Sequence, residues 1–523
     1  MATFSSYDYA VLAVTLISSS LIGVVYGFLE KKHKTTRNYL LADRSMKVIP
    51  VAFSVTASYI SAISLMGTPS EIYQFGSIIL YAMLALVLAT PTIAYGILPV
   101  FMNMGATSIY EYLELRFGVL LRVTVSLIFT FQQILFMAIA MYAPALALET
   151  VTGINRFLAI SVIGLVCTFY STIGGIKAVI ATDILQGILM VFPLLGAFIY
   201  ATIETERANQ VQVQRFSTVE GLRQSQKCVW WNLLFMTVLQ GLIFLGSIAI
   251  FWYYHNCDPL LEGRITSRDQ LLPLFIMDTM SHIPGLPGLM MSAIFCGALS
   301  SVSSVINSMS AIVLEDYLKP LNKVCCKVEL TARLTLLTTK AISLTLGIIF
   351  TASAFLGDCL GGLLEAALTT SGVVAGPILG VFLLGMLTMN ANHIGTLFGL
   401  VIGLCFASFM AFAQPKATLP ILELSTESCI NFEPQEYFVE SEEEYFWFYN
   451  VSFMWYSVIG FLATFICGYF LSWILYWCRL QSNEKLYIEN KNFNAMLLSP
   501  VFVETLVFFG WRKYEGSDED LYY

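Results

Sequence analysis

Charge is the scarcest property of this sequence. Only 12% of its 523 residues are Asp, Glu, Lys or Arg, and 57% are hydrophobic, whereas soluble domains average about 25% charged residues. This shortage excludes an ordinary soluble protein. No Lys- and Arg-rich block of the kind that binds nucleic acid occurs, so we expect no nucleic-acid partner. The composition predicts a chain that lies mainly within a lipid bilayer.

Catalytic and metal-binding signatures are missing as well. There is no GxSxG, HExxH or Walker loop, and none of the eleven cysteines forms a CxxC pair. The four histidines are widely separated: His33, His255, His282 and His393. We therefore expect neither an enzyme nor a bound cofactor. The first apolar run is long and follows Asp8 instead of basic residues, so we interpret it as a span and not as a cleaved signal peptide.

Long apolar runs fill most of the chain. A spanning helix needs about 20 such residues, and twelve segments meet that need. They are 8–29, 48–76, 78–101, 121–147, 156–175, 179–202, 229–254, 287–315, 334–356, 360–388, 393–414 and 446–478. The sequence therefore predicts an all-α polytopic membrane protein. We expect one transmembrane domain at 1–478 that includes an acidic extracellular loop at 415–446, and a cytoplasmic tail at 479–523.

Basic residues predict the orientation of these spans, because short cytoplasmic loops collect Lys and Arg. The loop after the first span holds six of them: Lys31, Lys32, Lys34, Arg37, Arg44 and Lys47. This places the N-terminus outside and, by the basic tail, the C-terminus in the cytoplasm. The alternation fails once, because 203–228 should lie outside and yet contains Arg207, Arg215, Arg223 and Lys227. Either a crossing is missing near 202–210, or the charge rule fails locally.

Two spans carry polar groups that are costly in a bilayer. The span 48–76 is rich in Ser and Ala, and we expect Gly67 and Pro69 to break its helix and free backbone carbonyls. The span 287–315 contains Ser300, Ser301, Ser303, Ser304 and Asn307. Such hydroxyls and carbonyls are hard neutral oxygens that suit Na⁺. Close helix packing explains the same small residues, so both interpretations stay open at this point.

Three further residues stand out. Asp183 follows the fifth span, where a carboxylate either guides a cation or pairs with Lys177. Cys257 and Cys429 fall in loops that we place outside, where the oxidising environment allows a disulfide. Two free thiols are the alternative.

Several stretches resemble the sodium/solute symporter family, in the branch of the iodide, sodium-coupled monocarboxylate and sodium-dependent multivitamin transporters. Among them are SYISAISLMGTPSEIYQFG, CTFYSTIGGIKAVIATDILQ and GALSSVSSVINSMSAIVLEDYLKP. The resemblance covers nearly all of 8–478. It implies a LeuT-type inverted-repeat bundle with an extra N-terminal helix in the plasma membrane. It also implies alternating access in which inward Na⁺ flow drives uptake of a small, organic anionic solute such as a monocarboxylate or vitamin.

The resemblance also implies site residues. The family's sodium site matches the carbonyls of Ala57, Ile60 and Gly297 and the hydroxyls of Ser300 and Ser301. Asp183 matches an aspartate on the intracellular ion route. By position in the family, candidates for the substrate cavity are Tyr59, Ser64 and Tyr142. Thr369 is a further candidate from its place in the span 360–388, where its hydroxyl either faces the cavity or bonds its own helix. The remaining polar groups of the serine-rich span, Ser303, Ser304 and Asn307, are interpreted as packing groups.

One departure from the family pattern coincides with the failure of the charge rule. Family members have thirteen spans, and ANQVQVQRF resembles the cytoplasmic end of their seventh, the sixth core helix. Here it directly follows residues 201–207, so most of that helix, at least about 20 residues, is predicted to be deleted. Two hypotheses follow. The chain is a splice form or incomplete gene model of a Na⁺-coupled symporter, or it is a non-transporting membrane protein. A channel is a third interpretation.

Overall fold

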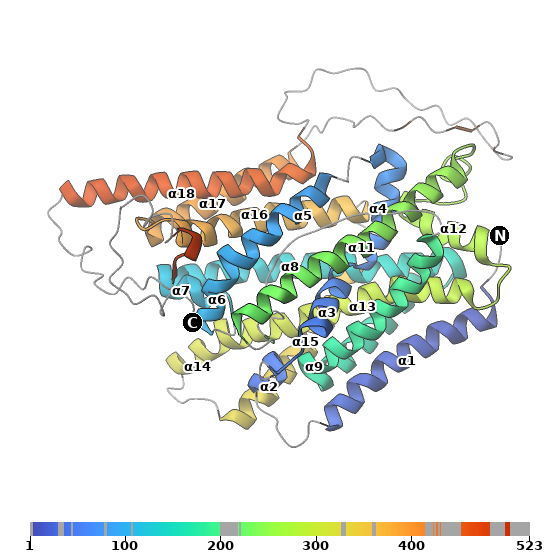
Figure 1. Ribbon diagram of the computed structural model, residues 1–523, viewed down its shortest axis with the longest axis horizontal. Coiled ribbons are helices and arrows are strands. Elements are labelled where there is room, and N and C mark those ends of the chain that lie inside the picture. The colour runs from blue at the N-terminus through green and yellow to red at the C-terminus, as the bar shows by residue number, and fades with distance from the viewer. Residues whose placement is uncertain are drawn as a thin grey trace.

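The structure, a computed structural model, describes residues 4–29, 36–42, 45–77, 81–105, 108–198, 218, 221–325, 331–357, 362–413, 422, 425–426, 429, 451–481 and 497–502. Its helices form one bundle along a common direction (Figure 1). In the first half they are α1 (Ser6–Leu29), α2 (Thr36–Leu41), α3 (Val48–Tyr59), α4 (Ala62–Phe75), α5 (Tyr81–Pro91), η4 (Thr92–Ile97), α6 (Leu98–Met104), α7 (Glu111–Phe117), α8 (Val119–Thr152) and α9 (Arg156–Phe198). In the second half they are α11 (Leu222–Tyr254), η5 (Arg268–Gln270), α12 (Leu271–Met280), α13 (Leu286–Ile312), η6 (Val313–Leu318), α14 (Lys319–Cys325), α15 (Ala332–Ala354), α16 (Leu363–Leu387), α17 (His393–Phe412), η9 (Phe453–Trp455) and α18 (Tyr456–Gln481).

Helix α9 contains two crossings. Before Gly175, the Tyr170 hydroxyl donates to the Leu299 carbonyl at 2.9 Å, and after it Asp183 accepts from Ser300 at 2.9 Å. A straight helix would separate two residues thirteen apart by about 20 Å, so the chain turns back between them. Gly175 makes this reversal with φ +64°, a conformation that other residues avoid.

The number of crossings matches the prediction within the described ranges. Ten helices there are long and apolar enough to span a membrane, and the bent pair of α3 and α4 makes eleven. Counting the two halves of α9 separately brings the described crossings to about twelve, as predicted.

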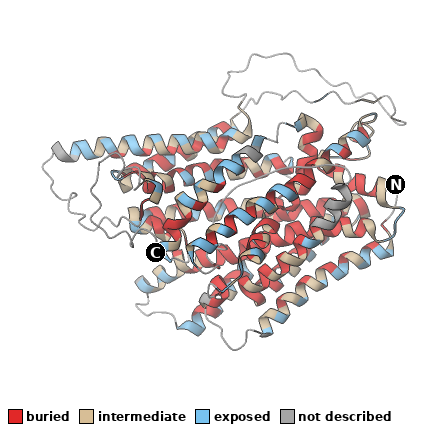
Figure 2. Cartoon of the chain, viewed as in Figure 1, coloured by how far each residue is buried: buried red, intermediate tan, exposed pale blue. Residues whose placement is uncertain are grey.

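Burial separates a central helix from peripheral ones (Figure 2). In α13 and its extension, 94% of the most apolar window is buried, against 22% in α1 and in α18. The exposed residues of α1 include Val14, Ile17 and Leu21. Apolar side chains on the outside of a bundle are suited to contact lipid. Helix α13, which carries the serine-rich stretch, therefore lies at the centre of the fold.

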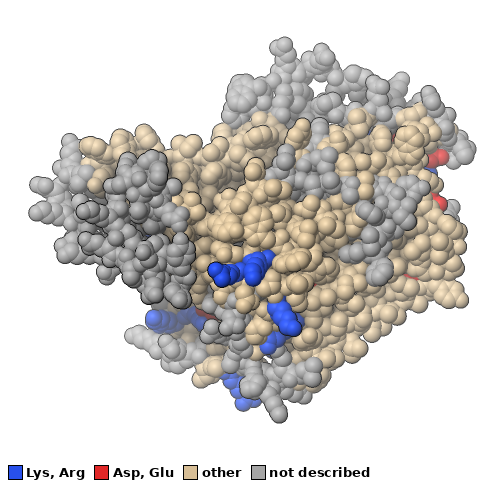
Figure 3. All heavy atoms as spheres, viewed as in Figure 1, with Lys and Arg blue, Asp and Glu red and all other residues tan. Residues whose placement is uncertain are grey.

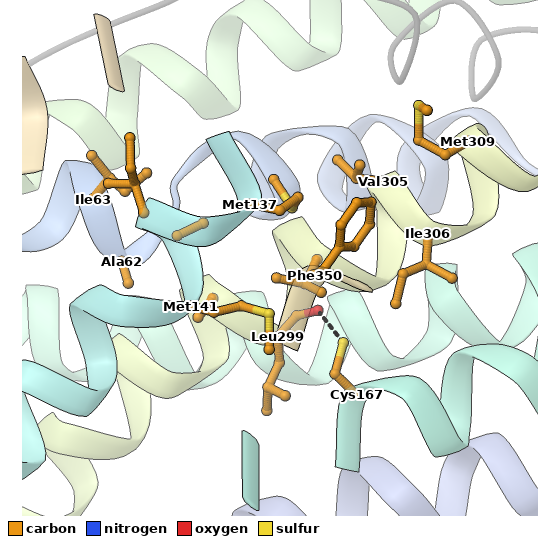
Figure 4. Close-up of a cluster of buried hydrophobic side chains, with 14 of the residues drawn as sticks. Ala62, Ile63, Met137, Met141, Cys167, Leu299, Val305, Ile306, Met309 and Phe350 are labelled. Carbon is orange, nitrogen blue, oxygen red and sulfur yellow. Dashed lines mark hydrogen bonds between the residues drawn. The ribbon is translucent and has the colours of Figure 1, made fainter. Parts of the chain in front are cut away.

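An apolar cluster fixes one face of α13 (Figure 4). Figure 4 labels ten of its neighbouring residues: Ala62, Ile63, Met137, Met141, Cys167, Leu299, Val305, Ile306, Met309 and Phe350. They come from α4, α8, α9, α13 and α15. The Cys167 thiol also donates to the Leu299 carbonyl, with Sγ 3.6 Å from the oxygen. Because apolar packing holds this face, the serines lie on the remaining faces of α13.

The second predicted span is broken, but not where the sequence suggested. The bend of 53° lies between α3 and α4, at Ile60 and Ser61, and Pro69 lies inside α4. The prediction of a break at Gly67 and Pro69 was therefore wrong. Ser61 explains the true position, because its hydroxyl accepts from the Ser64 amide at 3.4 Å and caps the new helix. A proline within a membrane helix is tolerated where neighbouring groups compensate for its missing hydrogen bond.

The second half of α9 and helix α11 run parallel. Ile176 and Ile180 share an apolar cluster with Cys228 and Val229, near the start of α3. Further along, Met190 packs with Met236 and Leu239 near the break. Three helices, α9 after Gly175, α3–α4 and α11, thus ascend in the same direction. The end of α9 at Phe198 and the start of α11 at Leu222 therefore lie at opposite ends of this parallel pair. The predicted deletion at 202–210 lies outside the described residues.

Thiol labelling can check this parallel arrangement. Single cysteines at Lys177 and Arg223, in a background that keeps only Cys257 and Cys429, are expected to react with a membrane-impermeant maleimide from the same side. The reason is that both positions stand at the beginning of parallel helices. Labelling in intact and in permeabilised cells measures the side. Reaction of the two cysteines from opposite sides would show that the helices are antiparallel and that no crossing is missing.

Polar contacts tie both ends of the bundle. At the end that carries α14, the Arg122 guanidinium bonds the buried Asp316 carboxylate (Nε–Oδ1 3.0 Å) and also Glu114. Asp316 further accepts from the Ser108 hydroxyl at 2.9 Å. At the opposite end, Cys257 and Cys429 form a disulfide. In the view of Figure 3, Lys and Arg lie toward the first of these ends and Asp and Glu toward the second.

Candidate ion-binding site

The serine-rich helix meets the helix break. The Ser301 hydroxyl donates to the Ser58 carbonyl at 2.8 Å and to the Gly297 carbonyl of its own helix at 2.9 Å. Gly297 allows this approach, because a Cβ at that position would lie 2.9 Å from the Ala62 nitrogen and 3.1 Å from the Ile60 oxygen. A side chain there would push α13 away from the break. The structure therefore brings Gly297, Ser301 and Ile60 together.

The end of α3 supplies carbonyl groups. The Ile60 amide bonds the Thr56 carbonyl and the Ser61 amide bonds the Tyr59 carbonyl, while Ser301 occupies the Ser58 carbonyl. None of these described contacts uses the carbonyl of Ala57 or of Ile60. The last carbonyls of a helix carry its partial negative charge. Two oxygen atoms suited to a cation are thus left at the break.

A buried carboxylate lies beside this point. Asp183, on the second half of α9, is fully buried and accepts hydrogen bonds from three serine hydroxyls: Ser54 at 2.7 Å, Ser300 at 2.9 Å and Ser58 at 3.3 Å. The Ser58 hydroxyl also lies 2.9 Å from that of Ser304 and 3.1 Å from that of Ser300. We call Asp183, Ser54, Ser58, Ser300 and Ser304 the Asp183 cluster. It joins α3, α9 and α13.

The hydroxyl protons of Ser300 and Ser301 are used in hydrogen bonds within the protein. A serine hydroxyl has one proton and two acceptor lone pairs. Ser300 donates its proton to Asp183, and Ser301 donates to backbone carbonyls. Their lone pairs therefore stay available to a positive ion. Ser300 belongs both to the Asp183 cluster and to the predicted sodium ligands, so it connects the two.

Sequence reasoning missed three members of the Asp183 cluster. Ser304 was interpreted as a packing group, yet it bonds the Ser300 carbonyl at 2.6 Å and lies beside Ser58. Ser54 and Ser58 were not singled out. They stand four residues apart and therefore share one face of α3. That spacing was the available signal, but it gains meaning only when Asp183 is known to face it.

The predicted cavity residues come from four helices. Tyr59 ends α3 and packs against apolar clusters shared with α11, and Ser64 stands half-buried in the first turn of α4. Thr369 on α16 is buried, and within the described part of the chain its hydroxyl has no hydrogen-bond partner. Tyr142 on α8 is directed elsewhere, because its hydroxyl accepts from Arg156 at 3.0 Å and its ring packs against Gly357.

Comparison with known proteins gives one consistent picture. The model of the sodium:solute symporter family matches residues 39–205 and, separately, residues 194–403. A Drosophila melanogaster protein described as a sodium-dependent multivitamin transporter is 44% identical over 474 residues, which cover 82% of this chain and 78% of that protein. Human sodium-coupled monocarboxylate transporter 1 is 34% identical over 481 residues, with the same coverage of 82% and 78%.

A solved structure shares the fold. It is a Na⁺-coupled sialic acid symporter in a substrate-bound outward-open state, and it aligns with a TM-score of 0.73 over 90% of this chain and 98% of its own. At 24% identity this likeness concerns the fold alone. The family match and the identities to the two transporters reach further. Together they show that this chain belongs to the sodium:solute symporter family.

Proposed function

We propose that this chain couples inward Na⁺ flow to the uptake of a small solute, as a symporter of the plasma membrane. One observation carries the proposal. Two hydroxyls of the central helix α13 meet the end of α3 at the helix break, where Ser301 bonds the Ser58 carbonyl and Ser300 bonds the buried Asp183. Polar groups are expensive in a membrane and usually mark the path of an ion or substrate.

In this proposal Na⁺ binds between the break and α13. Its ligands are the carbonyls of Ala57, Ile60 and Gly297 and the hydroxyls of Ser300 and Ser301. Five hard oxygen atoms suit Na⁺ better than a transition metal. Because the ligands belong to two helices, the ion stabilises the arrangement in which α3 and α13 touch, and it shifts the population toward that state. Asp183 lies beside this site and is proposed to guide the ion on its intracellular route.

A small organic anion is the proposed co-substrate. The relatives are described as multivitamin and monocarboxylate transporters, and many such solutes are carboxylates. Helix α4 begins at Ala62 in the middle of the bent span. Its N-terminus presents a partial positive charge, so it attracts an anion even where no Lys or Arg side chain is present. Tyr59, Ser64 and Thr369 are proposed to line the substrate cavity. The hydroxyl of Tyr142 is engaged by Arg156, so we propose that Tyr142 contributes its ring to the cavity and not its hydroxyl.

The orientation follows from charge. We propose that the end with Arg122 and α14 is cytoplasmic, because Lys and Arg gather toward it (Figure 3). The N-terminus then lies outside and the C-terminus inside. The disulfide between Cys257 and Cys429 lies on the extracellular side, in keeping with its redox environment. The transmembrane domain would be 1–478, with the acidic loop 415–446 outside and the tail 479–523 inside.

A second function is favoured by the parallel helices. The second half of α9 runs parallel to α11, although only residues 199–221 separate them, and the two family matches overlap in the same region, at 194–205. Both observations support the deletion of most of the sixth core helix, which in this fold forms a wall of the substrate cavity. The second candidate is therefore a non-transporting form of such a symporter.

Uptake measurements distinguish the two functions. Cells that express the chain are supplied with labelled nicotinate, biotin, pyruvate or iodide, in Na⁺ or in choline medium, and surface abundance is measured in parallel. We expect Na⁺-dependent uptake of at least one organic anion. Normal surface abundance without Na⁺-dependent uptake would favour the non-transporting form. A Na⁺ current without any co-substrate would favour a channel.

A further inference from the structure

One buried amide near the proposed ion path has no partner. Asn307 on α13 is only 2% exposed, and neither its Oδ1 nor its Nδ2 atom has a hydrogen-bond partner among the residues that the structure describes. Burying an amide without hydrogen bonds costs free energy. The neighbouring hydroxyls differ, because Ser304 donates to the Ser300 carbonyl and Ser310 lies 2.8 Å from the Ser343 hydroxyl. Asn307 is thus the unsatisfied group between two satisfied ones.

Its position continues the polar face of α13. Asn307 lies seven residues after Ser300 and three after Ser304, so it shares their side of the helix. At 1.5 Å per residue it stands about 10 Å beyond Ser300, toward the end of α13 that leads to Asp316. The opposite face is apolar, because Val305, Ile306 and Met309 lie in the central cluster (Figure 4). The amide therefore lies on the side of the Asp183 cluster.

We propose that Asn307 is a relay residue that contacts Na⁺ as the ion leaves the Asp183 cluster for the cytoplasm. The inference rests on the proposed function. The amide oxygen is a hard ligand that suits Na⁺, and the amide N–H groups can donate to the water that accompanies the ion. Because both atoms lack protein partners, the passing ion and its water displace no existing hydrogen bond. A purely structural asparagine would instead have its amide engaged by the fold.

A relay residue affects rates more than equilibrium. A contact made only during passage lowers the barrier between the ion site and the cytoplasm in both directions. It leaves the affinity of the site itself unchanged. A structural residue behaves differently, since its loss lowers stability. Kinetics and stability together therefore separate the two roles.

The test uses the full chain with Asn307→Leu, which replaces the amide by an apolar group of similar shape. We expect turnover of Na⁺-dependent uptake per surface copy to fall by about fivefold, the order by which one lost polar contact at a barrier changes a rate. The external Na⁺ concentration for half-maximal uptake should not rise by more than about twofold, and the melting temperature of the purified protein should not fall. Asn307→Ser, which keeps an oxygen and leaves room for water, should retain most of the turnover.

Thr464→Val is the matched control, because Thr464 on α18 is also fully buried with an unpartnered hydroxyl but lies on another helix. It should leave turnover unchanged. Unchanged turnover in Asn307→Leu would overturn the inference, and so would a lowered melting temperature with a proportional loss of surface copies. A rise in half-maximal Na⁺ would make Asn307 an equilibrium ligand and would likewise overturn the relay. If the unsubstituted chain shows no Na⁺-dependent uptake, the proposed function fails and the relay fails with it.

Discussion

Asp183→Asn is expected to weaken Na⁺ binding by about 10- to 100-fold, which is the effect of losing one charged partner. The substitution preserves the shape of the side chain but removes the negative charge that three serine hydroxyls now face. Na⁺ binding stabilises the folded protein by an amount that grows with the ratio of the Na⁺ concentration to the dissociation constant. The melting temperature of the purified protein, titrated with Na⁺ at constant ionic strength, therefore measures the affinity even where uptake is absent.

Two serine variants serve as comparisons for Asp183→Asn. Ser301→Ala removes a proposed sodium ligand whose hydrogen bonds go to Ser58 and Gly297 and not to Asp183, so it should also weaken binding. Ser292→Ala removes a buried hydroxyl of the same helix that, among the described residues, bonds the Gly288 carbonyl alone, at 2.7 Å, and should have no effect. An unchanged Na⁺ titration in both Asp183→Asn and Ser301→Ala would remove the ion-site assignment.

Arg122→Met is expected to destabilise the folded protein by about 3–5 kcal/mol, the usual cost of leaving one member of a buried ion pair without its partner. The Asp316 side chain is fully buried, and the Arg122 Nε donates to its Oδ1 at 3.0 Å. The surface abundance of the variant should fall sharply, and so should its melting temperature.

The double variant Arg122→Met with Asp316→Leu tests the cause. It removes both charges, so no buried carboxylate is left unpaired, and most of the lost stability should return. The second acidic partner of Arg122, Glu114, is 38% exposed and can be solvated by water. If the single variant were as stable as the unsubstituted protein, the ion pair would not contribute to holding α8 against η6.

Much of the fold could be predicted because a bilayer imposes a simple rule on sequence. Each crossing needs a long apolar run, and the predicted runs correspond to the described helices, including the two halves of α9 around Gly175. The charge pattern also marked 203–228 as the region where the alternation of sides fails, and the described helices on either side of that region run parallel. Apolar runs and the distribution of Lys and Arg can both be counted along the chain, so they can be interpreted without knowledge of tertiary contacts.

The details of the site depend on contacts that the sequence does not display. Pro69 looked like the breaking point, but the break occurs where Ser61 caps α4 and Gly297 lets α13 approach. Ser304 looked like a packing residue until Ser58 was found opposite it. The approach of Gly297 to the break and the contact of Ser304 with Ser58 each join residues more than 200 positions apart, and local propensity carries no information on such distant partners.

The bond between Cys257 and Cys429 closes a covalent ring. The two cysteines are 172 residues apart, and the ring contains α12, α13, α15, α16 and α17. Cleavage of the chain at any single point inside this ring opens it without producing two separate molecules. In a protein cleaved once inside the ring, the disulfide would still join the two fragments. On a denaturing gel they would migrate as two separate bands only after a reductant is added.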